Sequence, residues 1–299
     1  MGRGDLSDEE WARLEPHLPR NAGRGGRWQC HRRVINGILF RQRTGLPWRD
    51  LPSRFGKWKT VHDRHRRWSA DGTWERILRA VQADADADAD ADAEGLIDWS
   101  MVSVDSTSCR AHQHAAGAHS RPPGVPGRRS TPVQHRTDEA LGRSRGGLTC
   151  KIHLAGEGGR RPLAFVVTPG QWGDAPQLIP VLEQIRVPRP AGGHPRTRPD
   201  HLGGDKAYSS RRNRRYLRRR QIEHTIPEPK NQRANRQRRG SKGGRPTGFD
   251  REIYRRRNEV ERTINRPKIF RAVATRYDKR AYVFHGTVTV ASIRLWLRT

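Results

Sequence analysis

Residues 96–107 read Leu-Ile-Asp-Trp-Ser-Met-Val-Ser-Val-Asp-Ser-Thr, and the fold of the chain follows from this stretch. Its short apolar run ends at Asp105, as in a buried strand that carries a carboxylate at its carboxyl end. Residues 201–205, His-Leu-Gly-Gly-Asp, form a second short segment, which ends at Asp205 and is followed by a polar, helix-prone stretch. The sequence therefore predicts two strands that each end in an aspartate.

A third carboxylate lies within residues 254–268, Tyr-Arg-Arg-Arg-Asn-Glu-Val-Glu-Arg-Thr-Ile-Asn-Arg-Pro-Lys. On a helix, Tyr254, Arg257 and Glu261 stand at i, i+3 and i+7 and share one stripe, beside an apolar stripe that would pack on a core. From the helix alone, a solvated ion pair explains Glu261 as well as a functional site does. The two strand-end aspartates favour a site.

Two aspartates and one glutamate are hard oxygen ligands, the type that holds Mg²⁺ beside a phosphate. Two such ions about 3.5–4 Å apart can activate the attacking oxygen and stabilise the leaving oxygen of an in-line phosphoryl displacement. These residue types therefore indicate metal-dependent phosphoryl transfer.

The same residues resemble a known family, the bacterial DDE transposases of the insertion-sequence-5 group. Its signature is tyrosine, two residues, arginine, three residues, glutamate, six residues and a basic residue. Tyr254, Arg257, Glu261 and Lys268 occupy those positions. The resemblance covers nearly the whole chain, through residues 104–107, 110–118, 142–149, 205–209 and 274–279.

The resemblance implies a ribonuclease H-like catalytic domain with two Mg²⁺ ions, for which Mn²⁺ could substitute. The implied catalytic and metal-binding residues are Asp105, Asp205 and Glu261. The residues implied to contact DNA near the scissile phosphate are Tyr254, Arg257 and Lys268, with Lys206 as a weaker candidate.

One position departs from the family, because Pro267 stands where leucine is usual. Proline lacks the amide hydrogen and clashes with the carbonyl four residues back, here that of Thr263. If the helix continues past Lys268, we expect a kink that costs about 3 kcal/mol and moves Lys268. Replacing Pro267 with leucine should then raise activity and stability.

The chain is strongly basic: 60 Lys and Arg residues against 31 Asp and Glu give a net charge of +29. Such a chain usually binds a polyanion. The alternatives are a ribosomal or chromatin-like packing protein and a membrane-surface binder, the latter disfavoured because no basic amphipathic helix with a broad apolar face stands out. The chain has no apolar run of 18 residues, no signal peptide and no CxxC, so we expect a cytoplasmic, nucleoid-associated protein with free thiols.

A length of 299 residues predicts about two domains. The clearest boundary is an alternating Ala-Asp run, which is acidic and has no apolar face to bury. We therefore predict a helical DNA-binding domain at residues 1–82, a low-complexity linker at 83–95 and a catalytic domain at 96–299. We also expect residues 121–138 to form a loop, and the basic residues 230–246 to be mobile without DNA.

The N-terminal domain should be helical. Ser7 and Glu10 form a capping box, and a second helix follows from the apolar spacing of residues 34–39. Residues 48–56 and 59–68 predict a helix-turn-helix that recognises element ends. The residues suited to phosphates or base edges in a major groove are Lys59, Arg64, Arg66 and Arg67. The alternative is a plain helical bundle whose basic face is merely solvated.

The second domain should alternate strands and helices around a mixed sheet. The predicted helices lie near residues 175–185, 210–221 and 250–264. The predicted strands lie at residues 100–105, 149–154, 163–168, 202–205 and 224–226, with a hairpin turn at 157–160. His112 and His114 are more typical of a structural or phosphate-facing role than of a metal pair.

The sequence thus predicts a transposase that binds the terminal inverted repeats of its element and catalyses metal-dependent DNA cleavage and strand transfer. Its partners would be double-stranded DNA, both element ends and target, and a second copy or more within the DNA complex, with no membrane. One alternative is an inactive copy that only binds specific DNA and acts as a repressor. Another is a divalent-metal nuclease that does not join strands.

Overall fold

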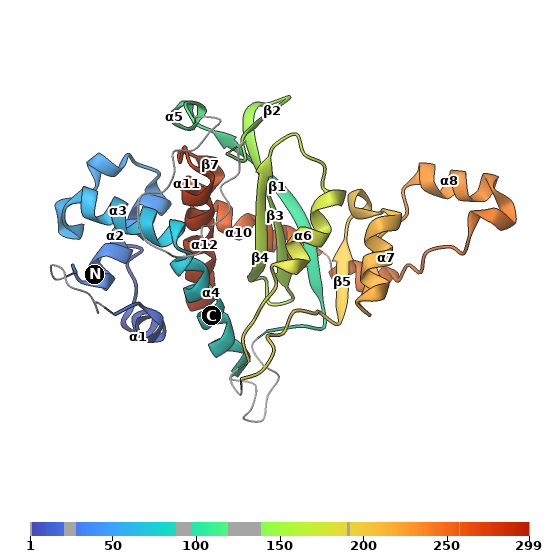
Figure 1. The fold of residues 1–299 in the computed structure, drawn as a ribbon, viewed down its shortest axis with the longest axis horizontal. Coiled ribbons are helices and arrows are strands. Elements are labelled where there is room, and N and C mark those ends of the chain that lie inside the picture. The colour runs from blue at the N-terminus through green and yellow to red at the C-terminus, as the bar shows by residue number, and fades with distance from the viewer. Residues whose placement is uncertain are drawn as a thin grey trace.

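The computed structural model describes residues 2–20, 28–87, 97–118, 139–189, 192–256 and 258–298, with backbone only for 258–261. A helical region at the N-terminus lies beside a seven-stranded sheet, and further helices cover both faces of that sheet (Figure 1). No helix within these residues is long and apolar enough to cross a membrane.

The N-terminal region begins with the predicted capping box. The Ser7 hydroxyl accepts the Glu10 amide at 3.1 Å, and the Ser7 amide donates to the Glu10 carboxylate at 2.7 Å. The predicted apolar positions of the second helix are all buried. The helices of this region are α1 (Asp8–Leu14), α2 (His31–Thr44), α3 (Trp58–Ala70) and α4 (Thr73–Ala87).

The sheet is mixed, with the strand order β4-β3-β1-β5-β6. Strand β3 is antiparallel to β1 and β4, whereas β5 and β6 are parallel to β1. This is the expected ribonuclease H-like arrangement, with hairpins first and parallel strands later. The strands are β1 (Val102–Ala111), β2 (Gly142–Ser144), β3 (Gly147–Glu157), β4 (Pro162–Pro169), β5 (His201–Gly204), β6 (Glu223–Thr225) and β7 (Thr275–Arg276).

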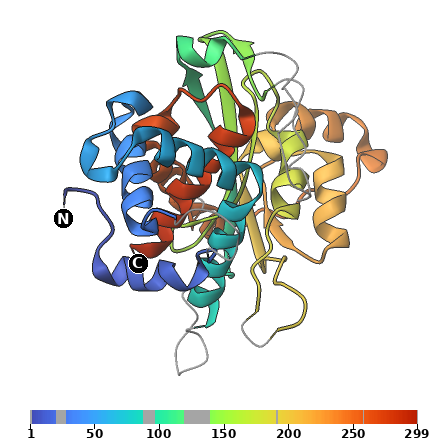
Figure 2. The ribbon, with the colours of Figure 1, turned by 60° about the vertical axis from the view of Figure 1, so that its left-hand side comes forward.

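Helices lie on both sides of the sheet (Figure 2). One face, which carries Asp105, Thr107 and Cys109, packs against α10 (Asn258–Lys268) and belongs to a core that includes α12 (Ala281–Leu297). The opposite face packs against α6 (Leu178–Glu183). Because side chains alternate along a strand, the residues of β1 are divided between these two cores.

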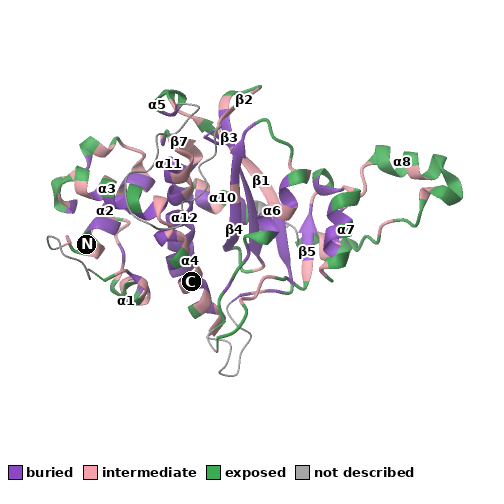
Figure 3. Cartoon of the chain, viewed as in Figure 1, coloured by how far each residue is buried: buried purple, intermediate pink, exposed green. Residues whose placement is uncertain are grey.

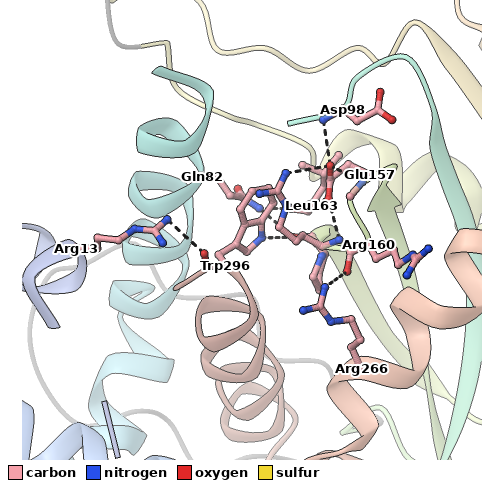
Figure 4. Close-up of polar contacts among 11 residues, drawn as sticks. Arg13, Gln82, Asp98, Glu157, Arg160, Leu163, Arg266 and Trp296 are labelled. Carbon is pink, nitrogen blue, oxygen red and sulfur yellow. Dashed lines mark hydrogen bonds and ion pairs between the residues drawn. The ribbon is translucent and has the colours of Figure 1, made fainter. Parts of the chain in front are cut away.

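The helical region and the sheet share a core rather than forming two separate ones. Helix α12, which sequence patterns did not predict, packs against α3 and α4. Gln82 of α4 and the Trp296 indole of α12 both donate to the Pro162 carbonyl of β4, at 3.2 and 2.7 Å (Figure 4 shows both side chains). The predicted division at residue 82 therefore crosses a packed interface.

Part of the predicted linker is helical, because α4 continues through Ala87. Alanine is the best helix former, and here Ala85 is fully buried while Asp86 accepts the Trp99 indole hydrogen at 2.9 Å. The linker prediction was wrong for residues 83–87, because an alanine of this run packs in the core and an aspartate accepts a hydrogen bond from a distant tryptophan. The rest of the predicted linker up to residue 95 lies outside the described residues.

One other local prediction was wrong. Residues 48–56 form two 3-10 turns instead of a helix, each directly after a proline, at Trp48–Asp50 and Ser53–Phe55. Within residues 230–246 the chain forms α8 (Lys230–Arg238), which has no buried residue and projects from the body (Figure 3); the mobility of this segment without DNA stays a prediction. The predicted loop at residues 121–138 lies outside the described residues.

Candidate active site and nucleic-acid interface

The register of two parallel strands brings the predicted aspartates together. Val104 of β1 pairs with Gly204, the last residue of β5; Asp105 follows within β1, and Asp205 directly follows β5. The prediction that the first strand ends at Asp105 was wrong, because β1 continues to Ala111. Adjacent strands lie about 4.8 Å apart, and paired residues share a face. Two carboxylates that are 100 residues apart in the sequence are therefore neighbours at one sheet edge.

Backbone amides orient both carboxylates. Asp105 Oδ1 accepts the Ser106 amide at 2.7 Å. Asp205 Oδ1 accepts the Ala207 amide at 2.8 Å and caps the 3-10 turn Lys206–Tyr208. Each aspartate is thus held by the backbone directly after it.

Helix α10 brings Lys268 to the same face. Lys268 Nζ donates to Thr107 Oγ1 at 2.9 Å, and Thr107 lies two residues beyond Asp105. Glu261, Ile264 and Lys268 share one helical stripe at i, i+3 and i+7, and Ile264 is buried in the core on this face. The side chain of Glu261 lies outside the described residues, and its role stays a prediction.

The expected displacement of Lys268 by Pro267 is not found. Helix α10 ends at Lys268, so the proline lies in its last turn. The amides of Ile269 and Phe270 donate to carbonyls three residues back, both at 3.2 Å, which closes the helix. Since the helix does not continue, the proline does not have to bend a following segment.

A polar cluster on the opposite face was not predicted. Asp174 Oδ1 accepts the Ser106 hydroxyl at 2.7 Å and Lys151 Nζ at 3.1 Å. Burial lowers the pKa of His153, beside Asp174, to about 4, although the Asp174 charge opposes this shift. One signal was available: Lys151 and His153 alternate with apolar residues in β3, so one face of that strand had to be polar near its end.

Tyr208 reports how close the carboxylates are to one another. Burial raises the pKa of this phenol well above its usual value, and the negative charges of Asp174, Asp105 and Asp205 raise it further. The charges of three carboxylates therefore act on one buried phenol.

The donor set fits a hard divalent cation. Asp105 and Asp205 supply carboxylate oxygens from β1 and from the residue directly after β5, and oxygen is the donor that a hard divalent cation prefers. Among the side chains that the structure describes, no group of three or more His, Cys, Asp or Glu residues is arranged to hold a metal ion. The third expected ligand, Glu261, is not among those side chains.

The basic residues of α3 are divided between surface and core. Lys59, Arg66 and Arg67 are exposed, as a DNA-binding face requires. Arg64 is only 4% exposed, and the prediction that it contacts DNA was wrong. The helix turns its Arg64 side inward, where the guanidinium lies 4.4 Å from the Trp28 ring centroid and 2.9 Å from His31 Nδ1.

The other predicted DNA contacts lie at or near the sheet edge. Lys206 is exposed directly after Asp205. Tyr254 lies half-buried in α9 (Arg251–Arg256), with its ring 5.1 Å from that of Phe249. Arg257 lies outside the described residues. Helix α7 (Arg211–Arg219) adds exposed arginines nearby, although Arg214 is buried and donates to the Ile226 carbonyl at 2.8 Å.

Comparison with known proteins identifies relatives for both parts of the chain. A family model described as "Transposase DDE domain" matches residues 97–296, and one described as "Putative transposase of IS4/5 family" matches residues 6–78. "Uncharacterized protein y4sN" of Sinorhizobium fredii is 34% identical over 38% of this chain and 82% of its own length. "Insertion element IS402 uncharacterized 16.2 kDa protein" of Burkholderia cepacia is 36% identical over 37% of this chain and 76% of its own.

Two further similarities are weaker. "Putative transposase for insertion sequence element IS402" of Burkholderia cepacia is 38% identical over 25% of this chain and 36% of its own length. The solved structure "Mos1 transposase paired-end complex with left transposon end" aligns over 84% of this chain and 80% of that chain, at 12% identity and a TM-score of 0.27. That score is too low to carry an argument about fold or function.

Proposed function

Because the chain belongs to the family of transposases with a DDE domain, we propose that it binds the terminal inverted repeats of its own insertion element and cuts and rejoins DNA there. The observation that carries this proposal is the register of β1 and β5, which makes Asp105 and Asp205 neighbours. Two neighbouring carboxylates repel each other when both are ionised, and a divalent cation bound between them would relieve that repulsion.

The proposed site uses this chain's residues in three roles. Asp105, Asp205 and Glu261 would hold two Mg²⁺ ions, which when bound supply the charge for activating an attacking oxygen and stabilising a leaving oxygen. Lys268, fixed by Thr107 on the Asp105 face, would bind the phosphate beside the scissile bond. The residue types fit cleavage by water followed by attack of a DNA 3′-hydroxyl.

End recognition is assigned to the exposed side of α3. Lys59, Arg66 and Arg67 would contact backbone phosphates or base edges. The net charge of +29 would attract DNA over the whole surface. Because an element has two ends, we expect at least two copies of the protein in the active DNA complex.

The test uses isosteric amides that remove charge without emptying the site. Asp105→Asn, Asp205→Asn and Glu261→Gln should each abolish Mg²⁺-dependent cleavage of a labelled duplex that carries an element end, while retaining binding to it. Asp200→Asn, an exposed aspartate just before β5, is the matched control and should cleave normally. Loss of end binding in all three site variants would assign these residues to structure instead.

The same assay separates the alternatives. Wild-type protein that binds ends specifically but does not cleave them with Mg²⁺ or Mn²⁺ would be an inactive, DNA-binding copy. Cleavage without strand transfer into a second duplex would indicate a nuclease.

A further inference from the structure

A cavity of about 620 Å³ lies where the helical region meets the far end of β1, apart from the carboxylates. Its walls come from the end of α2, residues 45–49, the start of α3, residues 112–114 and residues 277–283. His112 lies seven residues beyond Asp105 along an extended strand, which corresponds to about 23 Å. The cavity is therefore a second feature of the molecule and not an extension of the candidate active site.

A buried cation contributes to the wall of this cavity. The Arg41 side chain is 4% exposed, and its Nη2 donates to Asp278 Oδ1 at 3.2 Å. Its Nε and Nη1 have no acceptor among the described residues and are closed to solvent. Arg41 therefore gives the wall of the cavity positive charge.

Aromatic rings surround this guanidinium. The Arg41 guanidinium carbon lies 4.9 Å from the Trp48 ring centroid and 5.8 Å from that of Tyr277. The His112 ring lies 4.9 Å from the Tyr277 ring, because the His112 amide donates to the Arg276 carbonyl where β7 joins β1. Flat rings around a cation suit a flat ligand.

The mouth of the cavity is cationic. Arg49, Arg66 and Lys279 line it and are exposed, whereas the one acidic lining residue, Asp278, is buried against Arg41. The depth of the cavity thus offers aromatic faces, and its rim offers positive charge. Basic residues interleaved with aromatic ones are the pattern of single-stranded nucleic acid sites, where rings stack on bases and cations follow the phosphates.

The size of the cavity determines whether single-stranded or double-stranded DNA can enter it. A volume of 620 Å³ equals a cube about 8.5 Å on edge. A duplex cannot enter, since its major groove alone is about 12 Å wide. We propose that the cavity binds one unpaired nucleotide of a DNA strand, with its base among the rings, and with the flanking phosphates on Arg49, Arg66 and Lys279.

This inference rests on the proposed function for the source of the strand. With about 23 Å between the cavity and Asp105, and 3.4 Å per nucleotide, the bound nucleotide would lie about seven positions from the scissile phosphate. A base held there would fix the register of the strand before cleavage.

The experiment compares two single-stranded probes with the full-length protein. One is a fluorescent thymidine decamer, and the other is a decamer of abasic sugar-phosphate units with the same charge. We expect the thymidine decamer to bind about five- to a hundredfold more tightly, since only it can stack. Equal binding of the two probes would overturn the proposal.

Variants locate the effect. Leu46→Trp fills the cavity and Trp48→Leu removes a ring, so both should abolish the advantage of thymidine over abasic DNA. Arg66→Ala should weaken both probes equally and keep their ratio, and Arg189→Ala, an exposed arginine outside the cavity, is the matched charge control. Thermal unfolding of each variant checks its fold. A base advantage that survives Leu46→Trp in folded protein would place the base elsewhere and overturn the assignment.

Failure here is distinguishable from failure of the proposed function. Wild-type protein that cleaves element ends but binds both decamers equally refutes only the nucleotide cavity. Wild-type protein that prefers thymidine but neither binds nor cleaves duplex ends retains the cavity and refutes the function.

Discussion

Gly156 of β3 lies where α10 packs on the sheet, and its missing side chain sets the position of that helix. A Cβ atom added at Gly156 would meet Thr263 Cγ2 at 2.6 Å. Thr263 is fully buried, and its β-branched side chain has few alternative rotamers. Gly156→Ala should therefore push α10 away from the sheet rather than rotate one side chain.

The size of the effect follows from the overlap. Carbon atoms normally approach to about 3.5–4.0 Å, so the new methyl group would intrude by about 1 Å. Overpacking of this kind costs about 1–3 kcal/mol, which for a chain of this size lowers the Tm by about 2–10 °C. Because α10 carries Glu261 and Lys268, a shift of about 1 Å could lower the cleavage rate by about 100-fold.

The assay measures thermal unfolding and Mg²⁺-dependent cleavage of an element end for Gly156→Ala, Thr263→Ser and the double variant. Serine lacks Cγ2, so the double variant should recover at least half of the lost stability and much of the activity. Gly248→Ala is the matched control, because a Cβ there meets no described atom within 4 Å.

Two results would refute this reasoning. If Gly156→Ala unfolds at the wild-type temperature and cleaves normally, α10 is not seated on β3 at this point. If the single variant is impaired but Thr263→Ser gives no recovery, the damage does not come from this contact.

Acidification from about pH 6.5 to 4 should destabilise the protein. Burial lowers the pKa of His65 and of His153 to about 4 in the folded state. Over this pH range the unfolded chain therefore binds protons at both histidines, whereas the folded chain does not. In urea titrations, each of the two histidines should lower the free energy of unfolding by about 1.4 kcal/mol per pH unit over this range. If replacing either histidine with glutamine leaves the dependence of this free energy on pH unchanged, the prediction is contradicted. Pro267→Leu should change the free energy of unfolding by no more than about 1 kcal/mol and leave the cleavage rate unchanged, since α10 ends one residue later. A several-fold gain in the cleavage rate would instead support a kink at Pro267 that displaces Lys268. Arg64→Met should lower the free energy of unfolding by about 1–2 kcal/mol without weakening end binding, because Arg64 is buried. Arg67→Ala should weaken end binding and reduce its salt dependence by about one phosphate contact, because Arg67 is exposed. The reverse pattern in binding titrations would contradict the assignment of Arg64 to the core and Arg67 to the DNA-binding face.

The sequence by itself determined the features that depend on neighbours along the chain. The capping box at Ser7 and Glu10 is a contact across three residues, and the start of β1 follows from an apolar run of a few residues, although the strand continues past Asp105 to Ala111. The order of hairpin strands and later parallel strands limited the sheet to a mixed one. The family signature around Tyr254 and Glu261 added the chemistry.

Tertiary structure alone decided which side chains meet across long separations. Asp105 and Asp205 become neighbours only through the register of β1 and β5, which no local pattern encodes. Arg64 and Arg67 are chemically alike in the sequence, and the packing of α3 buries one and exposes the other. The continuation of α4 through the Ala-Asp run likewise depends on partners that belong to distant segments.

The physical reason is the range of the forces involved. Helix caps, strand alternation and turn residues are set by sterics and hydrogen bonds within a few residues, so they can be read in order along the chain. Burial and strand register are set by how whole elements pack. The role of a charged side chain beside an aromatic ring, or of a carboxylate beside another carboxylate, therefore depends on that packing. The cavity around Arg41, assembled from five separate segments, belongs entirely to this second kind.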